Sequence, residues 1–195
     1  MAVMRIGVLA LQGAFREHRR ALGRLGVDTL EVRLPEHLKG LSGLIIPGGE
    51  STTMMKLMET YGFDRAIPDF YRAGGAVWGT CAGAITLASE LPGYEEQPRL
   101  ALLPVAVCRN AYGRQIDSFE ADLEVAGGEG TFHGVFIRAP RITSVGEGVE
   151  VLSRFDGDPV LVRYGRVLVS IFHPELSGDD RIHLLFVQEV CRPTA

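Results

Sequence analysis

The chain has 195 residues, of which 46% are hydrophobic and 23% are charged, and its formal net charge is −4. This length suits one compact domain with its own core, and the composition is ordinary for a soluble globular protein. The small acidic excess and the absence of any basic run argue against nucleic acid as the main partner.

The first half of the chain alternates apolar runs with helical patterns. The apolar runs predict strands at 5–11, 28–32, 44–46 and 76–80, several of them buried on both faces as in a parallel sheet. Helical spacing predicts a helix from Ala14 to Gly26, a turn at 35–38, a helix with Ser51 as its N-cap that ends at Gly62, and a helix at 64–73. Strands that alternate with helices through short glycine turns indicate an α/β fold with a largely parallel sheet.

The pattern changes after Pro92, where the chain becomes rich in strands separated by glycine-rich turns. The expected strands lie at 100–107, 118–125, 131–139, 149–155, 160–164 and 167–172. This half is expected to be partly antiparallel, and a final helix is expected at 181–190, capped by Asp179 or Asp180. We find no repeat, low-complexity tract or linker, so the prediction is a single domain over 1–195: a three-layer α/β fold whose mostly parallel central sheet is flanked by helices, with a partly antiparallel, β-rich C-terminal half.

A nucleophile elbow is predicted directly after the strand at 76–80. The motif Gly-x-Cys-x-Gly at 79–83, followed by a helix-compatible stretch at 84–88, has the form of the lipase elbow with cysteine in place of serine. Its two glycines allow close backbone contacts, and Cys81 would project at a helix N-terminus, which favours a thiolate. By itself the motif fits a buried, inert cysteine as well.

A base for this cysteine is found at the end of the last buried strand. His173 and Glu175 are two apart, so the carboxylate can reach one imidazole nitrogen while the other faces outward. Cys81, His173 and Glu175, in this order along the chain, resemble a Ser-His-Asp catalytic triad in which cysteine and glutamate replace serine and aspartate. Taken alone, His173 would be interpreted as a surface histidine and Glu175 as a carboxylate at the start of a helix. The backbone N–H groups of Ala82 and of the Gly48-Gly49 loop are the expected oxyanion donors.

The cysteine count and spacing indicate the compartment and the absence of metal. Three cysteines are far apart, which fits a reducing compartment better than a disulfide framework. No Cys-x-x-Cys or His-x-x-x-His pairing indicates a metal site, and no cofactor is expected; the glycine-rich loop at 48–52 lacks the lysine and spacing of a phosphate-binding P-loop. No stretch is long enough to span a bilayer, so the expected location is the cytoplasm.

Five motifs together resemble a known family. They are Pro-Gly-Gly-Glu-Ser-Thr-Thr at 47–53, Gly-Thr-Cys-Ala-Gly at 79–83, Arg-Asn-Ala-Tyr-Gly-Arg-Gln at 109–115, Ser-Phe-Glu-Ala-Asp at 118–122 and Phe-His-Pro-Glu-Leu at 172–176. The cysteine and histidine motifs resemble the triad-type glutamine amidotransferases as a whole. The Leu-Gln-Gly start at 11–13, the Glu-Ser-Thr loop at 50–52 and the segment at 109–115 narrow the resemblance to the glutaminase subunits of pyridoxal 5'-phosphate synthase. The similarity runs from Ile6 to the last helix.

The resemblance implies a flavodoxin-like, class I glutamine amidotransferase that hydrolyses L-glutamine to L-glutamate and ammonia through a cysteine thioester. The ammonia would pass to a separate synthase subunit in a hetero-oligomeric complex. The residues that the resemblance assigns are Cys81, His173 and Glu175 for catalysis, Gly49 and Ala82 for the oxyanion, Gly49, Glu50, Ser51, Arg109, Ile137 and Arg138 for glutamine, and Gln12 for coupling to the synthase. Docking of the synthase is expected to complete the oxyanion hole beside Gln12.

Two other functions remain open at this point. A free-standing γ-glutamyl peptidase, or another cysteine hydrolase of this fold, would share the triad and need no partner. A non-enzymatic chaperone or redox sensor would lack a triad within reach, and its Cys81 would oxidise readily. Without the resemblance, Arg109 and Arg138 would be read as surface salt bridges.

Overall fold

A seven-stranded sheet forms the centre of the protein, whose computed structural model describes residues 4–109 and 118–191. The strand order is β10-β11-β12-β4-β3-β1-β2. In chain order the strands are β1 (Arg5–Leu9), β2 (Asp28–Val32), β3 (Gly43–Ile46), β4 (Ala76–Thr80), β10 (Glu150–Phe155), β11 (Asp158–Tyr164) and β12 (Val167–Ser170). The strands from β2 to β12 in this order are parallel, and β11 is antiparallel to both of its neighbours.

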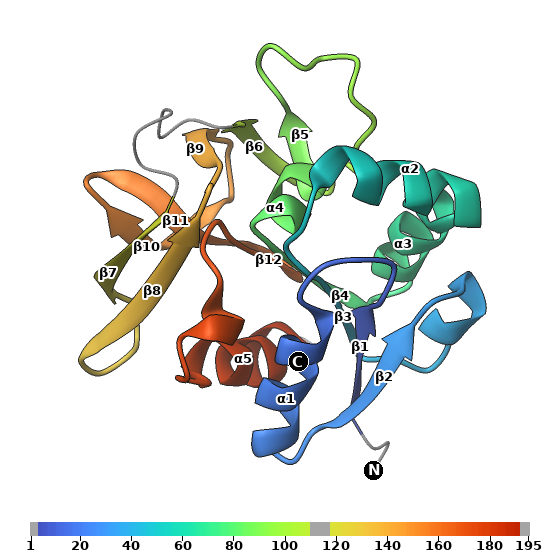
Figure 1. Ribbon diagram of the computed structural model, residues 1–195, viewed down its shortest axis with the longest axis horizontal. Helices are drawn as coiled ribbons and strands as arrows, with labels where there is room; N and C mark the ends of the chain where they lie inside the picture. The colour runs from blue at the N-terminus through green and yellow to red at the C-terminus, as the bar shows by residue number, and fades with distance from the viewer. Residues whose placement is uncertain (1–3, 110–117, 192–195) are drawn as a thin grey trace.

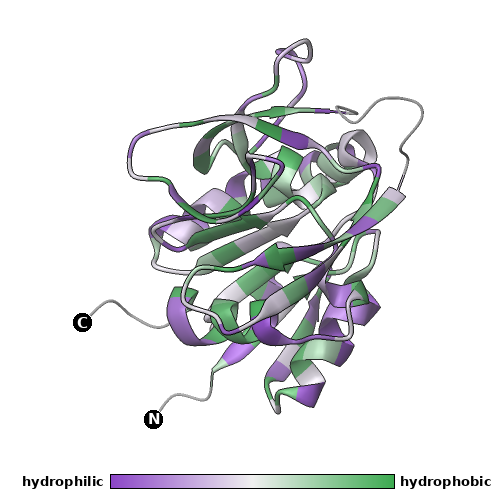
Figure 2. Cartoon of the chain, turned by 90° about the vertical axis from the view of Figure 1, so that its left-hand side faces the viewer, coloured by the Kyte–Doolittle hydropathy of each residue, from purple (hydrophilic) through white to green (hydrophobic). Residues whose placement is uncertain are grey.

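Helices cover both faces of this sheet (Figure 1). One side carries α1 (Phe15–Arg24) and α5 (Arg181–Leu185), and the other carries α2 (Ser51–Tyr61), α3 (Phe63–Arg72) and α4 (Ala82–Leu87). Apolar residues are concentrated in the central strands, and polar residues lie on the outer helix faces and loops (Figure 2). The prediction of a three-layer α/β fold with a mostly parallel sheet is confirmed.

Two smaller sheets supply the β-rich part that the second half of the sequence predicts. One contains β5 (Ala88–Glu90), β6 (Leu103–Cys108) and β9 (Arg141–Val145), and the other is the antiparallel pair β7 (Ser118–Glu124) and β8 (Thr131–Ile137). The short strands β5 and β9 are absent from the sequence prediction. Both are completed by pairing with β6, so their strand character depends on a neighbour rather than on their own pattern.

The N-cap of α2 corrects one prediction. Ser51 is the first helical residue, and Glu50 is the N-cap, with extended φ and ψ of −103° and 115°. Its carboxylate accepts hydrogen bonds from the N–H groups of Thr52 at 3.0 Å and Thr53 at 2.7 Å. Residue preferences favour serine at this position, but a glutamate reaches both N–H groups with its two oxygens.

The C-terminal helix also departs from the prediction. It divides into α5 and a π-helical segment, η3 (Phe186–Val190). Asp180 occupies the N-cap position, but its side chain pairs with Arg24, with Oδ1 2.6 Å from Nη2. The carboxylate that accepts from the first helical N–H, that of Arg181, belongs to Asp179 at 2.9 Å.

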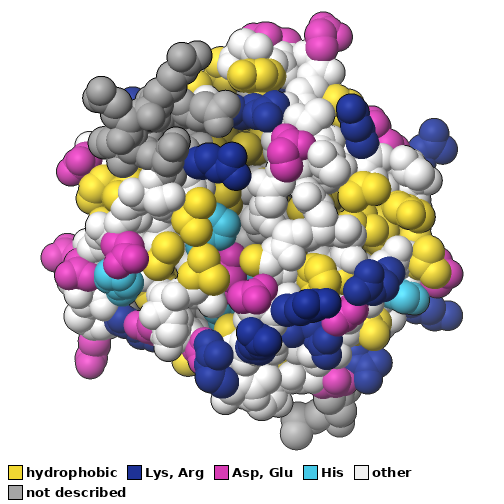
Figure 3. Space-filling model, viewed as in Figure 1, with side chains coloured by type: hydrophobic (Ala, Val, Ile, Leu, Met, Phe, Trp, Pro, Cys, Tyr) yellow, Lys and Arg dark blue, Asp and Glu magenta, His cyan; other side chains and the backbone are white. Residues whose placement is uncertain are grey.

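The parallel strands bring the ends of distant segments together. Because parallel strands share one carboxyl-end edge, the loops after β1, β3, β4 and β12 meet there, where ligands bind in open α/β sheets. On the face shown in Figure 3, basic side chains gather toward the lower right with a few acidic side chains among them, and the other acidic side chains are scattered. Within residues 4–109 and 118–191, no helix is long and apolar enough to cross a membrane.

Candidate active site

Cys81 lies on a strained turn between β4 and α4. Its φ of 49° and ψ of −103° are unusual for a residue with a side chain, as at other nucleophile elbows. The flanking glycines are required by space. A Cβ on Gly79 would lie 2.5 Å from the carbonyl oxygen of Gly83, and a Cβ on Gly83 would overlap the carbonyl oxygen of Ile46. The predicted elbow is therefore confirmed in its geometry.

His173 and Glu175 follow β12 and lie next to this turn. His173 Nδ1 is 2.8 Å from Glu175 Oε1, and the His173 backbone N–H donates to the carbonyl of Val135 on β8 at 2.8 Å. Glu175 belongs to a 3-10 turn, η2 (Pro174–Leu176), rather than to the extended chain that the prediction assumed. The contact between the two side chains forms nevertheless, because the turn folds the carboxylate back onto the ring.

The electrostatics around His173 favour its protonated form. Burial works against a charged imidazole, but hydrogen bonds to Cys81 and to Glu175 outweigh it and raise the pKa of His173 to about 10. Burial likewise disfavours a charged Glu175, yet the neighbouring His18 and the hydrogen bond from His173 lower the pKa of this carboxyl below its usual value. The site thus places the protonated ring of His173 between the carboxylate of Glu175 and the sulfur of Cys81.

The loop between β3 and α2 closes over the histidine and the cysteine. A Cβ on Gly48 would lie 2.6 Å from His173 Cε1 and 3.3 Å from the Cβ of Cys81. Only a glycine allows this approach. On its other side the loop is held by Gln12, whose amide donates to the carbonyl of Glu50 at 2.7 Å.

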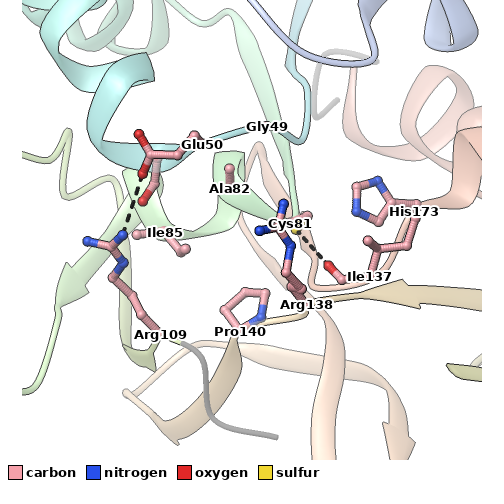
Figure 4. Close-up of a pocket in the computed structure, with 11 residues that line it drawn as sticks. Gly49, Glu50, Cys81, Ala82, Ile85, Arg109, Ile137, Arg138, Pro140 and His173 are labelled. Atoms are coloured by element: carbon pink, nitrogen blue, oxygen red, sulfur yellow. Dashed lines mark hydrogen bonds and ion pairs between the residues drawn. The ribbon is translucent and has the colours of Figure 1, made fainter. Parts of the chain in front are cut away.

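A cavity of about 250 Å³ opens beside these groups. Its lining residues are Gly49, Glu50, Ser51, Cys81, Ala82, Ile85, Arg109, Ile137, Arg138, Pro140 and His173. In Figure 4 the ion pair between Glu50 and Arg109 lies on one side of Cys81 and His173 lies on the other. The thiol of Cys81 is 3.8 Å from the carbonyl oxygen of Ile137.

The charged groups of this cavity are ordered by their neighbours. Arg109 Nη2 is 3.5 Å from Glu50 Oε1, its other terminal nitrogen donates to Gln97, and its guanidinium lies 4.6 Å from the centre of the Tyr94 ring. Partial burial works against the charge of Glu50, but hydrogen bonds from Thr52 and Thr53 lower its pKa to about 2. Glu50 is therefore charged at neutral pH.

The structure brings together nearly all of the residues that the sequence singled out. The predicted oxyanion and glutamine residues all line the cavity, as do Cys81 and His173, whereas Glu175 lies behind His173 and Gln12 behind the loop. Of the motif at 109–115, only Arg109 lies within the described residues. Ile85 and Pro140 also line the cavity and were not predicted, since an apolar residue in the chain carries no signal for a binding site.

Comparisons with known proteins point in one direction. A model of the SNO glutamine amidotransferase family matches residues 8–192. A Thermus thermophilus protein named pyridoxal 5'-phosphate synthase subunit PdxT is 59% identical, covering 94% of this chain and 96% of its own. A Deinococcus radiodurans protein of the same name is 55% identical, again over 94% and 96%. A crystal structure of a glutamine amidotransferase matches with a TM-score of 0.91 and 58% identity, covering 95% of this chain and 98% of that chain. The structure of PurLQS from Thermotoga maritima, at a TM-score of 0.69, 20% identity and coverage of 92% and 91%, shares the fold.

Proposed function

The chain belongs to the SNO glutamine amidotransferase family, and on this premise we propose how its residues carry out the work of a glutaminase subunit of pyridoxal 5'-phosphate synthase. The fold is that of the class I glutamine amidotransferases. The reaction is the hydrolysis of L-glutamine to L-glutamate and ammonia, and the ammonia serves a synthase subunit. The observation that carries the proposed mechanism is the placement of Cys81 at the cavity wall beside His173, whose Nδ1 is 2.8 Å from Glu175.

The first half of the reaction forms a thioester. The proton of the Cys81 thiol passes to His173, and the sulfur attacks the side-chain amide carbon of glutamine. A C–S bond forms while the carbonyl electrons move onto oxygen. The backbone N–H groups of Gly49 and Ala82 stabilise this oxyanion. His173 then gives its proton to the amide nitrogen, the C–N bond breaks, and ammonia leaves.

The second half of the reaction regenerates the enzyme. A water molecule gives a proton to His173 and attacks the thioester carbon, the C–S bond breaks, and glutamate departs. Glu175 accepts from Nδ1–H throughout, so the other nitrogen, Nε2, remains the one that exchanges protons with sulfur, nitrogen and water. A pKa of about 10 for His173 keeps the proton available to the leaving group at neutral pH.

Substrate recognition follows from the charges of the cavity. Free glutamine carries an ammonium and a carboxylate, so its pocket needs an anionic group and several donors. Glu50 meets the ammonium, and Arg109 and Arg138 meet the carboxylate. Gly49 and Ser51 provide main-chain groups of the loop, and Ile137 bounds the cavity beside the thiol.

Docking of the synthase subunit in a hetero-oligomeric complex acts on the loop through Gln12. The amide of Gln12 holds the carbonyl of Glu50, and a Cβ on Gly13 would overlap the carbonyl oxygen of Gly48. A movement of residues 12–13 therefore moves the loop that carries the Gly49 N–H. Gating of this kind keeps glutamine from being hydrolysed without an acceptor for ammonia.

The whole chain acts as one glutaminase domain over residues 1–195, and its place is the cytoplasm. Three free cysteines, one of them the nucleophile, suit a compartment that keeps thiols reduced. No metal or cofactor takes part in the steps above.

The test is ammonia release from L-glutamine by the purified chain, with and without the cognate synthase subunit. We expect release that requires Cys81, by comparison with Cys81→Ala, and that rises when the synthase is added. Cys108→Ala is the matched control, since Cys108 is absent from the cavity lining, and it should keep full activity. Cleavage of γ-glutamyl peptides without ammonia release from glutamine would overturn the assignment, and equal rates with and without the synthase would overturn the gating.

A further inference from the structure

A cluster of buried polar side chains lies behind Glu175, on the side away from the cavity. It consists of His18 on α1, Thr80 at the end of β4 and His183 on α5, and each of them has an exposed fraction of 0%. The steps of the reaction above use none of these three. Histidine is seldom fully buried unless its ring nitrogens have partners, so the hydrogen-bond partners of these rings identify their role.

The cluster forms a continuous path from the C-terminal helix to the carboxylate. His183 Nε2 is 2.9 Å from His18 Nδ1, and His18 Nε2 is 3.3 Å from Thr80 Oγ1 and 3.4 Å from Glu175 Oε2. That last distance is long for a hydrogen bond. Within the described part of the chain, Glu175 Oε2 has no hydrogen-bond partner although its side chain is fully buried, and its contact with His18 Nε2 is an ion-pair contact.

The unpartnered atoms select one arrangement of protons. Each neutral histidine carries one N–H, and the pair His18–His183 shares one of them. Suppose that His18 donates from its Nδ1 to Nε2 of His183. The single N–H of His183 then lies on its own Nδ1, which is buried and has no partner within the described residues. In addition, the unprotonated Nε2 of His18 faces the carboxylate of Glu175. In the reverse arrangement His183 donates to His18, and the Nε2–H of His18 points at Thr80 and Glu175. Only a lone pair is then left unpartnered, which is less costly than an unpartnered N–H.

We propose that His18, in the tautomer that His183 imposes, is a positioning residue for catalysis: it holds Glu175 Oε2 so that Oε1 stays aligned with Nδ1 of His173. The proposal rests on the proposed role of Glu175 in the triad. His18 acts through the carboxylate and touches neither glutamine nor the reacting sulfur.

The surroundings keep both rings neutral and in place. The titratable groups that face His18 are Glu175, His173, Glu17 on its own helix, and His183, and those that face His183 are His18 and Arg24. Burial lowers the pKa of His18, and burial together with its neighbours lowers the pKa of His183 well below its usual value. Trp78 packs edge-on against both rings, with ring centres 5.5 Å and 4.9 Å apart, which prevents the imidazoles from turning.

The contact between His18 and Glu175 also connects the triad to α1, the helix that follows Gln12. His18 lies on α1, which begins at Phe15, and α1 packs against both η2 and α5. The carboxylate is thus held by an element outside the sheet that carries Cys81. Because the ring and the Glu175 carboxylate are both fully buried, solvent does not compete with His18 for Oε2 in the intact protein.

The experiment compares four chains, each assayed with the synthase subunit: wild type, His18→Gln, His18→Asn and His18→Leu. Glutamine places its amide nitrogen near the position of Nε2 and preserves a donor to Glu175, whereas asparagine and leucine do not. We expect His18→Asn and His18→Leu to lose about tenfold in kcat at unchanged KM, and His18→Gln to keep most of the wild-type kcat. The basic limb of the kcat profile should move to lower pH in the two deficient variants, because His173 loses its aligned carboxylate.

Two further measurements separate a loss of alignment at Glu175 from a loss of stability. Thermal unfolding of each variant separates lost stability from lost alignment, and the pH dependence of alkylation of Cys81 by iodoacetamide, read by mass spectrometry, reports on His173 without glutamine or synthase. Equal kcat for His18→Gln and His18→Asn, or a loss without any shift of the pH profile, would overturn the proposal. Absence of ammonia release in the wild type would count against the proposed function instead, and the alkylation profiles would still decide the role of His18.

Discussion

The two sides of the cavity are held in different ways. The side proposed to carry out the reaction, with Cys81, His173 and Glu175, follows buried strands of the main sheet, and the Glu175 side chain is 0% exposed. The side proposed to recognise glutamine, with Glu50, Arg109 and Arg138, comes from loops, and the side chains of Glu50 and Arg109 are 55% and 17% exposed. Because Glu175 is buried, its contact with Nδ1 of His173 does not exchange with water, whereas the exposed side chain of Glu50 can adjust to a ligand.

The largest expected effect comes from breaking the reaction side with Glu175→Gln. The amide would present either oxygen or N–H to Nδ1 of His173, and the imidazole would lose its fixed tautomer and the support for its positive charge. We expect kcat for glutamine hydrolysis to fall by about 10²- to 10⁴-fold, with little change in KM. Steady-state kinetics with the synthase present measures the effect. Glu59→Gln, an exposed residue of α2, is the matched control and should leave kcat within twofold of the wild type.

A smaller loss of kcat is expected from Gly48→Ala, because Gly48 lies in the loop that contacts both His173 and Cys81. The added Cβ would lie 2.6 Å from His173 Cε1, so the ring or the loop must move. A displacement of about 1 Å in a catalytic group lowers the rate by about 100-fold. The control is Gly23→Ala in α1, where an added Cβ meets nothing within 4 Å. This control should stabilise the protein by about 0.5 to 1 kcal/mol and keep its activity. Full activity of Gly48→Ala would show that the loop is less constrained than its geometry indicates.

Arg109→Gln weakens the recognition side alone. A charge-assisted hydrogen bond to the glutamine carboxylate contributes about 1.5 to 3 kcal/mol, which corresponds to a 10- to 100-fold rise in KM. We expect kcat to change by much less, because Arg109 is remote from the sulfur and the imidazole. Arg72→Gln is the control, since its side chain is 71% exposed in a surface ion pair on α3. An equal fall of kcat and kcat/KM would place Arg109 on the reaction side and contradict the comparison.

The smallest effect is expected for the stability contribution of Glu50. Its pKa of about 2 in the folded protein lies below the ordinary value of 4.5, so its contribution is fully present above pH 4.5 and is lost as the pH falls toward 2. Glu50→Gln keeps one acceptor for the helix N-terminus and should lower the stability by about 0.5 kcal/mol at pH 7. Urea unfolding at pH 7 and pH 3 measures this, and the gap between wild type and variant should narrow at the lower pH. A gap that widens on acidification would contradict the capping role.

Much of the molecule could be predicted because its signals are local. A buried parallel strand requires a continuous apolar run, and an elbow requires small residues on both sides of Cys81, so both leave a readable pattern. Three of the motifs that carry the family resemblance, at 47–53, 79–83 and 172–176, lie where such strands end. These motifs contain six of the residues that line the cavity: Gly49, Glu50, Ser51, Cys81, Ala82 and His173.

Other features could not be predicted because they depend on a neighbour from elsewhere in the chain. Strands β5 and β9 form because they pair with β6. Ser51 is predicted as the N-cap because the sequence does not show that the turn before α2 lets the Glu50 carboxylate reach the first N–H groups of the helix. His18 follows helical spacing like its apolar neighbours, so nothing in the sequence separates it from a core residue.

The sequence by itself determined the layered α/β fold, the elbow cysteine, the His173–Glu175 pair and the resemblance to glutaminases, since each depends on residues close together in the chain. Only the tertiary structure decided that His18 and His183, 165 positions apart, meet behind Glu175. The reason is physical: hydrogen bonds between distant segments depend on how the layers pack, and the arrangement of protons in a buried cluster depends on which atoms the packing leaves without partners.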